Sequence, residues 1–468
     1  MMKTALNRLA SLTAALLLTA AASAADRPNI LWISCEDMSP NLAAYGDPLA
    51  HTPTLNALAR QGTTYKRAFA TSPVCSASRS AIITGMYPAS FGAQHHRSSV
   101  PLPDGVDILP TYLREAGYYC TNNAKTDYNF PMPDNAWHDS SNKAHWRNRP
   151  DSAQPFFSVF NFNVTHEGRV FLPEKKFLQE TPDVSATRRL RPDQVTLPPY
   201  IPDTPTARAD WARYYTMIAQ LDVQVKNLLD ELHADGLSTN TLVVFFSDHG
   251  MGMPRGKRWL YDTGLHVPLI IRWPGTLKPG STNEELLTLA DLAPTMLAVA
   301  GLERPAHMHG RAFLTGSRQP EPEFVFATRD RMDDVHDMSR SVRSRDFKYI
   351  RHFYPDRSYM MEIAYMEQNR TLSEMRTLAA DGLLTGPATL YFEPGKPREE
   401  LFDLRNDPWE IRNLAADNDY ATTLTLMRRE LDTWMEQIDD HGLQPETSDA
   451  KRTGAAAKKR QQRAREKQ

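Results

Sequence analysis

The feature that most constrains this 468-residue chain is a set of short apolar segments that alternate with helix-forming segments. Residues 29–34, 156–162, 241–247 and 267–273 are almost wholly apolar, which is typical of strands buried on both faces. Residues 208–233 carry apolar side chains at helical spacing, which predicts one long amphipathic helix. The sequence therefore predicts an α/β fold in which a large, mixed, mostly parallel sheet is sandwiched by helices.

Shorter segments complete this pattern. Further helices are expected at 53–60, 76–86 and 108–116, and further strands at 63–69 and 118–122.

The pattern of apolar segments changes after about residue 314. Segments 324–328, 341–352 and 400–404 predict shorter strands of a second, α+β unit. We expect a catalytic domain at 25–315, a smaller C-terminal α+β subdomain at 316–445 and a disordered basic tail at 446–468.

The N-terminus has the order of a secretory signal peptide. Lys3 and Arg8 precede an apolar run, and Ala22-Ser23-Ala24 follows it, so we expect residues 1–24 to be removed after Ala24. The apolar run is too short to span a bilayer comfortably, and no later stretch is long and apolar enough. We expect a periplasmic or secreted protein with no membrane span. Its net charge of −2 predicts no field that would attract nucleic acid.

Polar clusters directly follow three of the predicted strands, where sites form in sheets of this type. They are Glu36-Asp37, Thr165-His166-Glu167 and Asp248-His249. Clustered carboxylates raise one another's pKa unless a cation neutralises them, and oxygen ligands favour calcium or magnesium over zinc. Acids at a single strand end could merely cap a helix, but the two acidic pairs together favour a metal site.

Cys75 is the most informative of the three cysteines, which do not make a disulfide framework. It stands where a helix should begin, and Arg79 lies one turn later on the same face. A helix N-terminus stabilises a thiolate and attracts anions. From these residues alone, Cys75 could be a thiol nucleophile or a buried structural cysteine.

The segment Cys75-Ser76-Ala77-Ser78-Arg79, followed by residues 80–85 ending in Thr84-Gly85, resembles the signature of type I sulfatases, a family of alkaline-phosphatase-like fold. That signature is Cys-x-Pro-x-Arg or Cys-x-Ala-x-Arg before Thr-Gly. Further blocks extend the resemblance in register over most of the chain: 27–30 with Glu36-Asp37, 247–250, Gly256-Lys257, 266–271 with 273–275, 291–295 and 400–408.

The resemblance implies a role for each matching residue. A separate maturation enzyme would convert Cys75 to formylglycine, whose hydrate would supply the nucleophilic oxygen and which Arg79 would hold. Ca²⁺ would be held by Glu36, Asp37, residue 75, Asp248 and His249. Lys125, His166 and Lys257 would bind the sulfate group, and His166 would protonate the leaving group.

Four positions depart from the usual pattern of the family. Glu36 replaces an aspartate, His249 an asparagine, Ala77 a proline and Asp127 a histidine. We leave Asp127 out of the sulfate-binding set, because a carboxylate beside a sulfate is costly unless Lys125 or Arg79 pairs with it.

The resemblance also suggests a substrate. The chain is similar to N-sulfoglucosamine sulfohydrolases and iduronate-2-sulfatases, which favours a sulfate ester or sulfamate on a heparan-type glucosamine. His95 and the segment 329–334 are candidates to bind the sugar, although a solvated surface loop explains each of them better. Two alternatives stay open: a phosphodiesterase or phosphonate hydrolase of the same superfamily, and an inactive, secreted glycan-binding protein.

Overall fold

The computed structural model describes residues 27–316, 318–447 and 450. The predicted signal peptide and nearly all of the predicted basic tail lie outside the described residues.

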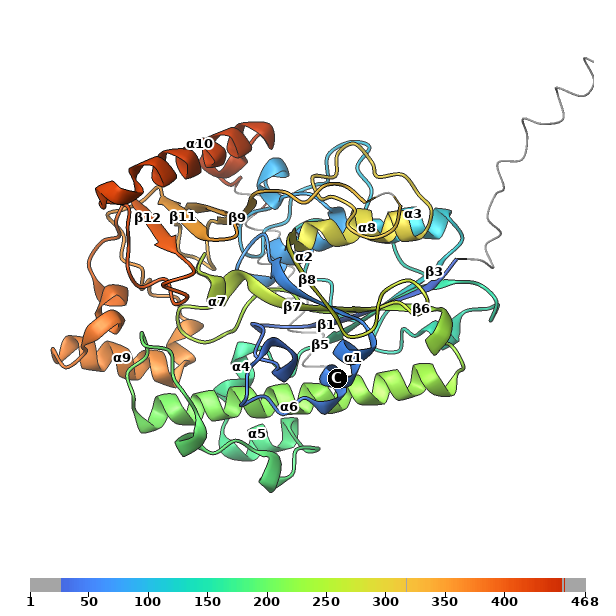
Figure 1. The fold of residues 1–468 in the computed structure, drawn as a ribbon, viewed down its shortest axis with the longest axis horizontal. Coiled ribbons are helices and arrows are strands. Elements are labelled where there is room, and N and C mark those ends of the chain that lie inside the picture. Colours follow the sequence, from blue (N-terminus) through green and yellow to red (C-terminus); the bar gives the residue numbers. More distant parts are fainter. Residues whose placement is uncertain (1–26, 317, 448–449, 451–468) are drawn as a thin grey trace, which may run out of the picture.

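The core of the molecule is an eight-stranded sheet of order β4-β3-β5-β1-β6-β7-β2-β8 (Figure 1). Its strands are β1 Asn29–Cys35, β2 Thr63–Phe69, β3 Tyr119–Asn123, β4 Asp139–Ser140, β5 Phe156–Phe162, β6 Thr241–Ser247, β7 His266–Arg272 and β8 Ser281–Thr288. All neighbouring pairs are parallel except those of β7, which runs antiparallel to β6 and β2. The prediction of a mixed, mostly parallel sheet is confirmed.

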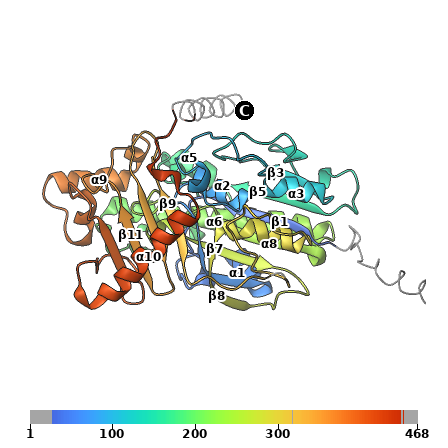
Figure 2. The same cartoon turned by 90° about the horizontal axis from the view of Figure 1, so that it is seen from above.

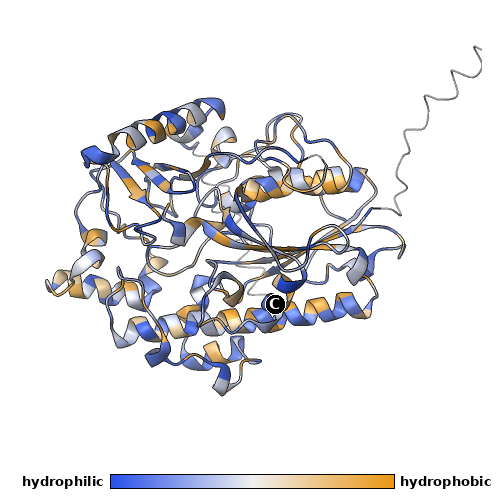
Figure 3. Cartoon of the chain, in the orientation of Figure 1, coloured by the Kyte–Doolittle hydropathy of each residue, from blue (hydrophilic) through white to orange (hydrophobic). Residues whose placement is uncertain are grey.

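Helices cover both faces of this sheet because its strands are apolar on both faces. Along β1, Ile30 and Trp32 pack into one hydrophobic cluster, whereas Leu31 and Ile33 pack into the other. The first cluster lies under α2 (Cys75–Thr84), α3 (Leu109–Glu115) and α8 (Leu292–Val299), and the second under α1 (Pro53–Gln61) and α6 (Pro205–Ala234). Figure 3 shows α8 as almost continuously hydrophobic, whereas hydrophobic and hydrophilic residues alternate along α6.

Three short helices complete the large unit: α4 (Glu167–Val170), α5 (Glu174–Glu180) and α7 (Asp262–Leu265). No helix in the described part of the chain, the 30-residue α6 included, combines the length and the apolar character that crossing a membrane requires.

A second, antiparallel sheet of order β12-β11-β10-β9 lies beside the large unit (Figure 2). Its strands are β9 Val325–Arg329, β10 Ser339–Arg343, β11 Phe347–His352 and β12 Glu399–Asp403, and α10 (Ala421–Gln437) covers one face. The prediction of a single strand over 341–352 is wrong, because the Ser344 hydroxyl accepts the N–H of Phe347 and turns the chain into a hairpin.

The long connection between β11 and β12, residues 353–398, leaves the small sheet and returns to it. It contains α9 (Arg370–Ala380), which packs against α6 of the large unit. This connection brings residues of the C-terminal third of the chain to the carboxyl edge of the large sheet.

Candidate active site

The site lies where three adjacent parallel strands end. β1 pairs with β5 and β6, so that Cys35 is level with Phe162 and Ser247. The residues that follow these strands therefore emerge together. The N–H of Asp248 donates to the carbonyl of Cys35, and the N–H of Met38 donates to that of His249, both at 3.1 Å. The predicted strand-end clusters meet at one edge.

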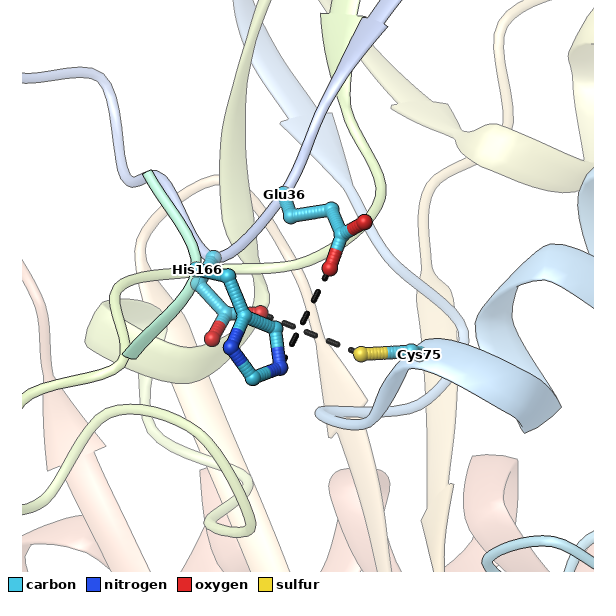
Figure 4. A group of neighbouring side chains, drawn as sticks. Glu36, Cys75 and His166 are labelled. Carbon is cyan, nitrogen blue, oxygen red and sulfur yellow. Dashed lines mark hydrogen bonds and ion pairs between the residues drawn. The ribbon is translucent and has the colours of Figure 1, made fainter. Parts of the chain in front are cut away.

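Helix α2 carries Cys75 into this edge. All ten residues of α2 are buried, and Gly85 ends the helix in the left-handed conformation that glycine adopts without strain. The Cys75 side chain lies at the first turn, with its Sγ 3.2 Å from His249 Nε2 and 3.8 Å from Asp37 Oδ1. Figure 4 shows Glu36, Cys75 and His166 converging from the end of β1, the start of α2 and the start of α4.

Two overlapping groups of side chains could hold a metal ion. One comprises Glu36, Asp37, Cys75 and His166; the other comprises Cys75, Asp248 and His249. Within each group, one ligand atom per residue lies within 4.8 Å of the others. The five residues predicted as metal ligands therefore come together around residue 75. The three carboxylates in these groups favour a hard divalent cation such as Ca²⁺ over zinc.

A basic side chain faces each of the three carboxylates. Lys125 Nζ is 2.8 Å from Glu36, Lys257 Nζ is 2.9 Å from Asp37, and Arg79 Nε is 2.9 Å from Asp248. Arg79 also donates to the Asn161 side chain at 2.8 Å.

These pairs keep the site ionised despite its burial. Burial alone would raise the pKa of Glu36, but Lys125, His166 and Arg79 bring that pKa down to about 2. Burial acts on Asp37 in the same sense, and Lys257 and the nearby histidines hold its pKa well below the usual value. Carboxylates and ammonium groups are thus charged together at neutral pH.

His166 caps α4 at the rim of this cluster. Its Nδ1 accepts the N–H of Gly168 at 3.2 Å, and its Nε2 lies 3.9 Å from Glu36 Oε2. Burial and then the charge of Lys257 lower the pKa of His166. The ring is therefore neutral, and because Nδ1 accepts, the proton sits on Nε2, which faces the cluster.

Asp127 enters the site as a partner of Lys125. Its Oδ2 lies 3.4 Å from Lys125 Nζ, and its Oδ1 lies 3.9 Å from Arg97 Nε. Burial would raise the pKa of Asp127, but Lys125 and Arg97 lower it below the usual value. The pairing that a carboxylate beside a sulfate would need is present.

Sequence reasoning missed several residues at this edge. Glu167 stood in a predicted cluster without a role; it is buried, 3.2 Å from Lys257 and bonded through both oxygens to Arg258 at 2.8 and 2.9 Å. The position of Arg258 next to Lys257 was the available signal. Tyr365 comes from the β11–β12 connection, and its ring centroid lies 6.4 Å from that of His166. No local pattern in the sequence connects these two rings.

The expectation of solvated loops at 95–97 and 329–334 is wrong for most of their residues. His95 is 2% exposed, its Nδ1 accepts the N–H of Arg331, and burial lowers its pKa to about 4. Arg329, Asp330 and Arg331 are buried as well. Ion pairs to Asp337, Arg340 and Glu446 respectively neutralise these side chains, which allows the segment to be buried. His95 therefore has no surface to offer a sugar.

Solved structures share this fold. A protein in complex with its substrate D-glucosamine-2-N,6-O-disulfate superposes with a TM-score of 0.64 at 18% identity, over 90% of this chain and 100% of the other. The phosphonate monoester hydrolase of Agrobacterium radiobacter superposes with a TM-score of 0.65 at 20% identity, over 89% and 97%. These likenesses show the fold, and the fold alone does not separate the different activities of the proteins that have it.

Sequence comparison makes that separation. The family model described as Sulfatase matches residues 28–150 and 119–302, and a second, described as N-sulphoglucosamine sulphohydrolase, C-terminal, matches residues 251–381. The chain is 40% identical to an ulvan-active sulfatase of Formosa agariphila, over 90% of this chain and 77% of that protein. It is 28% identical to human N-sulphoglucosamine sulphohydrolase, over 91% and 93%. The chain belongs to the sulfatase family, whose members hydrolyse sulfate esters or sulfamates.

Proposed function

We propose that this sulfatase removes sulfate from a sulfated polysaccharide, using a formylglycine made from Cys75 and a bound Ca²⁺. The observation that carries the proposal is the position of the Cys75 sulfur. It lies among three carboxylates and three basic side chains, at the N-terminus of α2, where backbone N–H groups favour negative charge.

The roles of the surrounding residues follow from their contacts. When formed, the formylglycine supplies, as its hydrate, the attacking oxygen and a second hydroxyl through which the aldehyde is regenerated. Arg79, fixed by Asp248 and Asn161, orients that group. Lys125 and Lys257 neutralise the sulfonyl oxygens, on which negative charge is held through the transition state.

His166 is placed to donate the proton that the leaving oxygen or nitrogen needs. Its Nε2–H faces the cluster, while the N–H of Gly168 holds the ring through Nδ1. The ring is neutral at rest, so it must take up a second proton to act as a general acid, because only the imidazolium form gives up a proton near neutral pH.

Glu36, Asp37, Asp248 and His249, together with residue 75, would hold Ca²⁺. The ion would add positive charge beside the sulfate group. Glu167 binds both Lys257 and Arg258, which keeps the Lys257 ammonium group beside Asp37.

Two relatives suggest which sulfated carbohydrate to test first. The relative at 40% identity is named an ulvan-active sulfatase, so ulvan oligosaccharides are our leading substrate. The second candidate is a heparan-type glucosamine sulfate, the N-sulfate ahead of the 6-O-sulfate, because the human relative is named N-sulphoglucosamine sulphohydrolase. We place the protein in the periplasm or outside the cell, in agreement with the composition of residues 1–24.

The test is a panel of defined substrates given to the mature enzyme. It contains ulvan oligosaccharides, N-sulfoglucosamine, glucosamine-6-sulfate, an aryl phosphate diester and a phosphonate monoester. We expect sulfate release from at least one saccharide with a higher kcat/KM than hydrolysis of either phosphorus ester. Faster cleavage of the phosphorus esters would overturn the proposal, and activity on glucosamine sulfates alone would replace ulvan by the second candidate.

A further inference from the structure

We propose that Arg97 forms a second anion-binding position beside the sulfate pocket and holds a carboxylate or second sulfate of the same saccharide. This inference rests on the proposed function and deepens it, because it assigns the substrate a second charged group at a defined side of the site.

The backbone of Arg97 is held in an uncommon conformation next to the first turn of α2. Its φ is 56°, in the left-handed region. The N–H of Arg97 donates to the hydroxyl of Ser76, the residue after Cys75, at 2.9 Å, and the N–H of His96 donates to the carbonyl of Arg331 at 2.9 Å. A non-glycine residue in the left-handed region persists where its surroundings fix it, and such residues gather at functional sites.

The guanidinium group of Arg97 is paired less tightly than those of Arg79 and Arg258. Its nearest carboxylate is Asp127, at 3.9 Å, and Asp127 lies closer to Lys125, at 3.4 Å. The buried Nε of Arg97 has no hydrogen-bond partner among the described residues. By contrast, Arg79 and Arg258 each make short hydrogen bonds to a carboxylate and are buried.

Arg97 is also partly accessible to solvent. Its side chain is 33% exposed, whereas those of Arg79 and Arg258 are nearly sealed. Tyr365 is exposed too, and its ring lies beside that of His166 at the rim of the site. Arg97 and Tyr365 therefore offer exposed groups to a ligand whose sulfate sits at residue 75.

The chemistry of the group defines what it binds. A guanidinium presents paired N–H donors that match a carboxylate or a sulfate in a bidentate manner. The sulfate to be cleaved already has Lys125, Lys257 and Arg79 around it, so Arg97 is available to a different anionic group. An acidic saccharide supplies such a group on the same or the adjoining sugar.

The competing explanation is that Arg97 serves only to neutralise Asp127. These explanations differ in what the removal of the charge does to substrate preference. If Arg97 only supports Asp127, its loss lowers activity on acidic and neutral saccharides alike. If it binds a substrate anion, the loss falls mainly on saccharides that carry one.

The experiment compares wild type with Arg97→Gln, with Arg60→Gln at the exposed end of α1 as the matched control. Substrates are used in pairs: sulfated uronate-containing oligosaccharides against the same material after carboxyl reduction, and glucosamine-2-N,6-O-disulfate against N-sulfoglucosamine. We expect Arg97→Gln to lower the ratio of kcat/KM, substrate with the second anion over substrate without it, by about 10-fold or more for one pair, mainly through KM. The pair that responds identifies carboxylate or second sulfate as the ligand.

Arg97→Lys keeps the positive charge but loses the paired N–H donors, so it should lower the ratio less than Arg97→Gln does. This second variant also keeps the test valid if Arg97→Gln folds poorly. An unchanged ratio in both variants, or a wild type without preference for the anionic member of either pair, overturns this inference. Sulfate release by wild type from the members that lack the second anion would then leave the proposed function standing. Absence of sulfate release from every saccharide would overturn both.

Discussion

Two of the clusters of buried charge in the described part of the molecule differ in one respect. The site cluster surrounds Cys75 at the edge of the large sheet. The second, which we call the small-sheet cluster, lies beside β9 and β10 and consists of Arg329, Asp330, Asp337, Arg340, Lys396 and Asp440.

In the small-sheet cluster, each of the six charged side chains is paired with another and is shielded from solvent. Arg340 is 0% exposed and binds both oxygens of Asp330 and both of Asp440, at 2.5–3.1 Å. In the site cluster, Lys125 and His166 stay partly exposed, and the charges converge on a thiol. Similar residue types thus hold two strands together in one region and leave groups available for a ligand in the other.

The strongest test of this contrast is Cys75→Ala. We expect sulfate release to fall below about one per cent of wild type with the fold retained, because loss of a covalent catalyst costs several kcal/mol. Cys120→Ala, in a buried position of β3 away from the site, is the matched control and should stay active. Substantial activity of Cys75→Ala would remove residue 75 from the chemistry.

Chelation should come next in size. Removal of divalent ions with EDTA should abolish turnover, because the carboxylates and imidazoles of the site are placed to serve as ligands of a common cation. Calcium should restore activity best, as measured by sulfate release after dialysis into each ion. Recovery with zinc and not with calcium or magnesium would contradict the metal assignment.

Arg340→Met should separate the two clusters by stability. It leaves Asp330 and Asp440 buried without their common partner, so we expect the free energy of unfolding to fall by about 3–5 kcal/mol. Arg405, an exposed residue that forms ion pairs with Asp346 and Asp403, provides the control. Arg405→Met should lower the free energy of unfolding by at most about 1 kcal/mol. Equal costs in denaturant titrations would mean that the small-sheet cluster does not hold the fold.

The smallest effect is expected at Tyr365, which is 37% exposed beside His166. Tyr365→Ala should raise the KM for saccharides roughly 5-fold, since an aromatic contact contributes about 1 kcal/mol. Leu383→Ala, an exposed apolar residue in the same connection, should leave KM unchanged. A loss confined to kcat would assign Tyr365 to the chemistry rather than to binding.

The sequence predicted the elements whose signal is local. The strands at 63–69 and 156–162 have the predicted bounds. β8 was missed because its first half is polar, as suits the edge of the sheet. α10 was missed although Leu424, Met427, Leu431 and Trp434 carry helical spacing.

The same distinction holds for the site. Parallel strands bring their carboxyl ends together, so Glu36, Asp37, Asp248 and His249 could be grouped from the sequence alone. The approach of Tyr365 to His166 depends on how the 353–398 connection packs, which no periodicity records. The burial of His95 depends on ion pairs and hydrogen bonds between segments more than 200 residues apart.

The burial of Cys75 bears on whether its thiol can be modified before or after the chain folds. The side chain is 1% exposed, and every residue of α2 is buried with it. A maturation enzyme that recognises several residues around the thiol cannot reach them once α2 is packed. If a separate enzyme carries out the proposed oxidation, we therefore expect it to act on the nascent or unfolded chain.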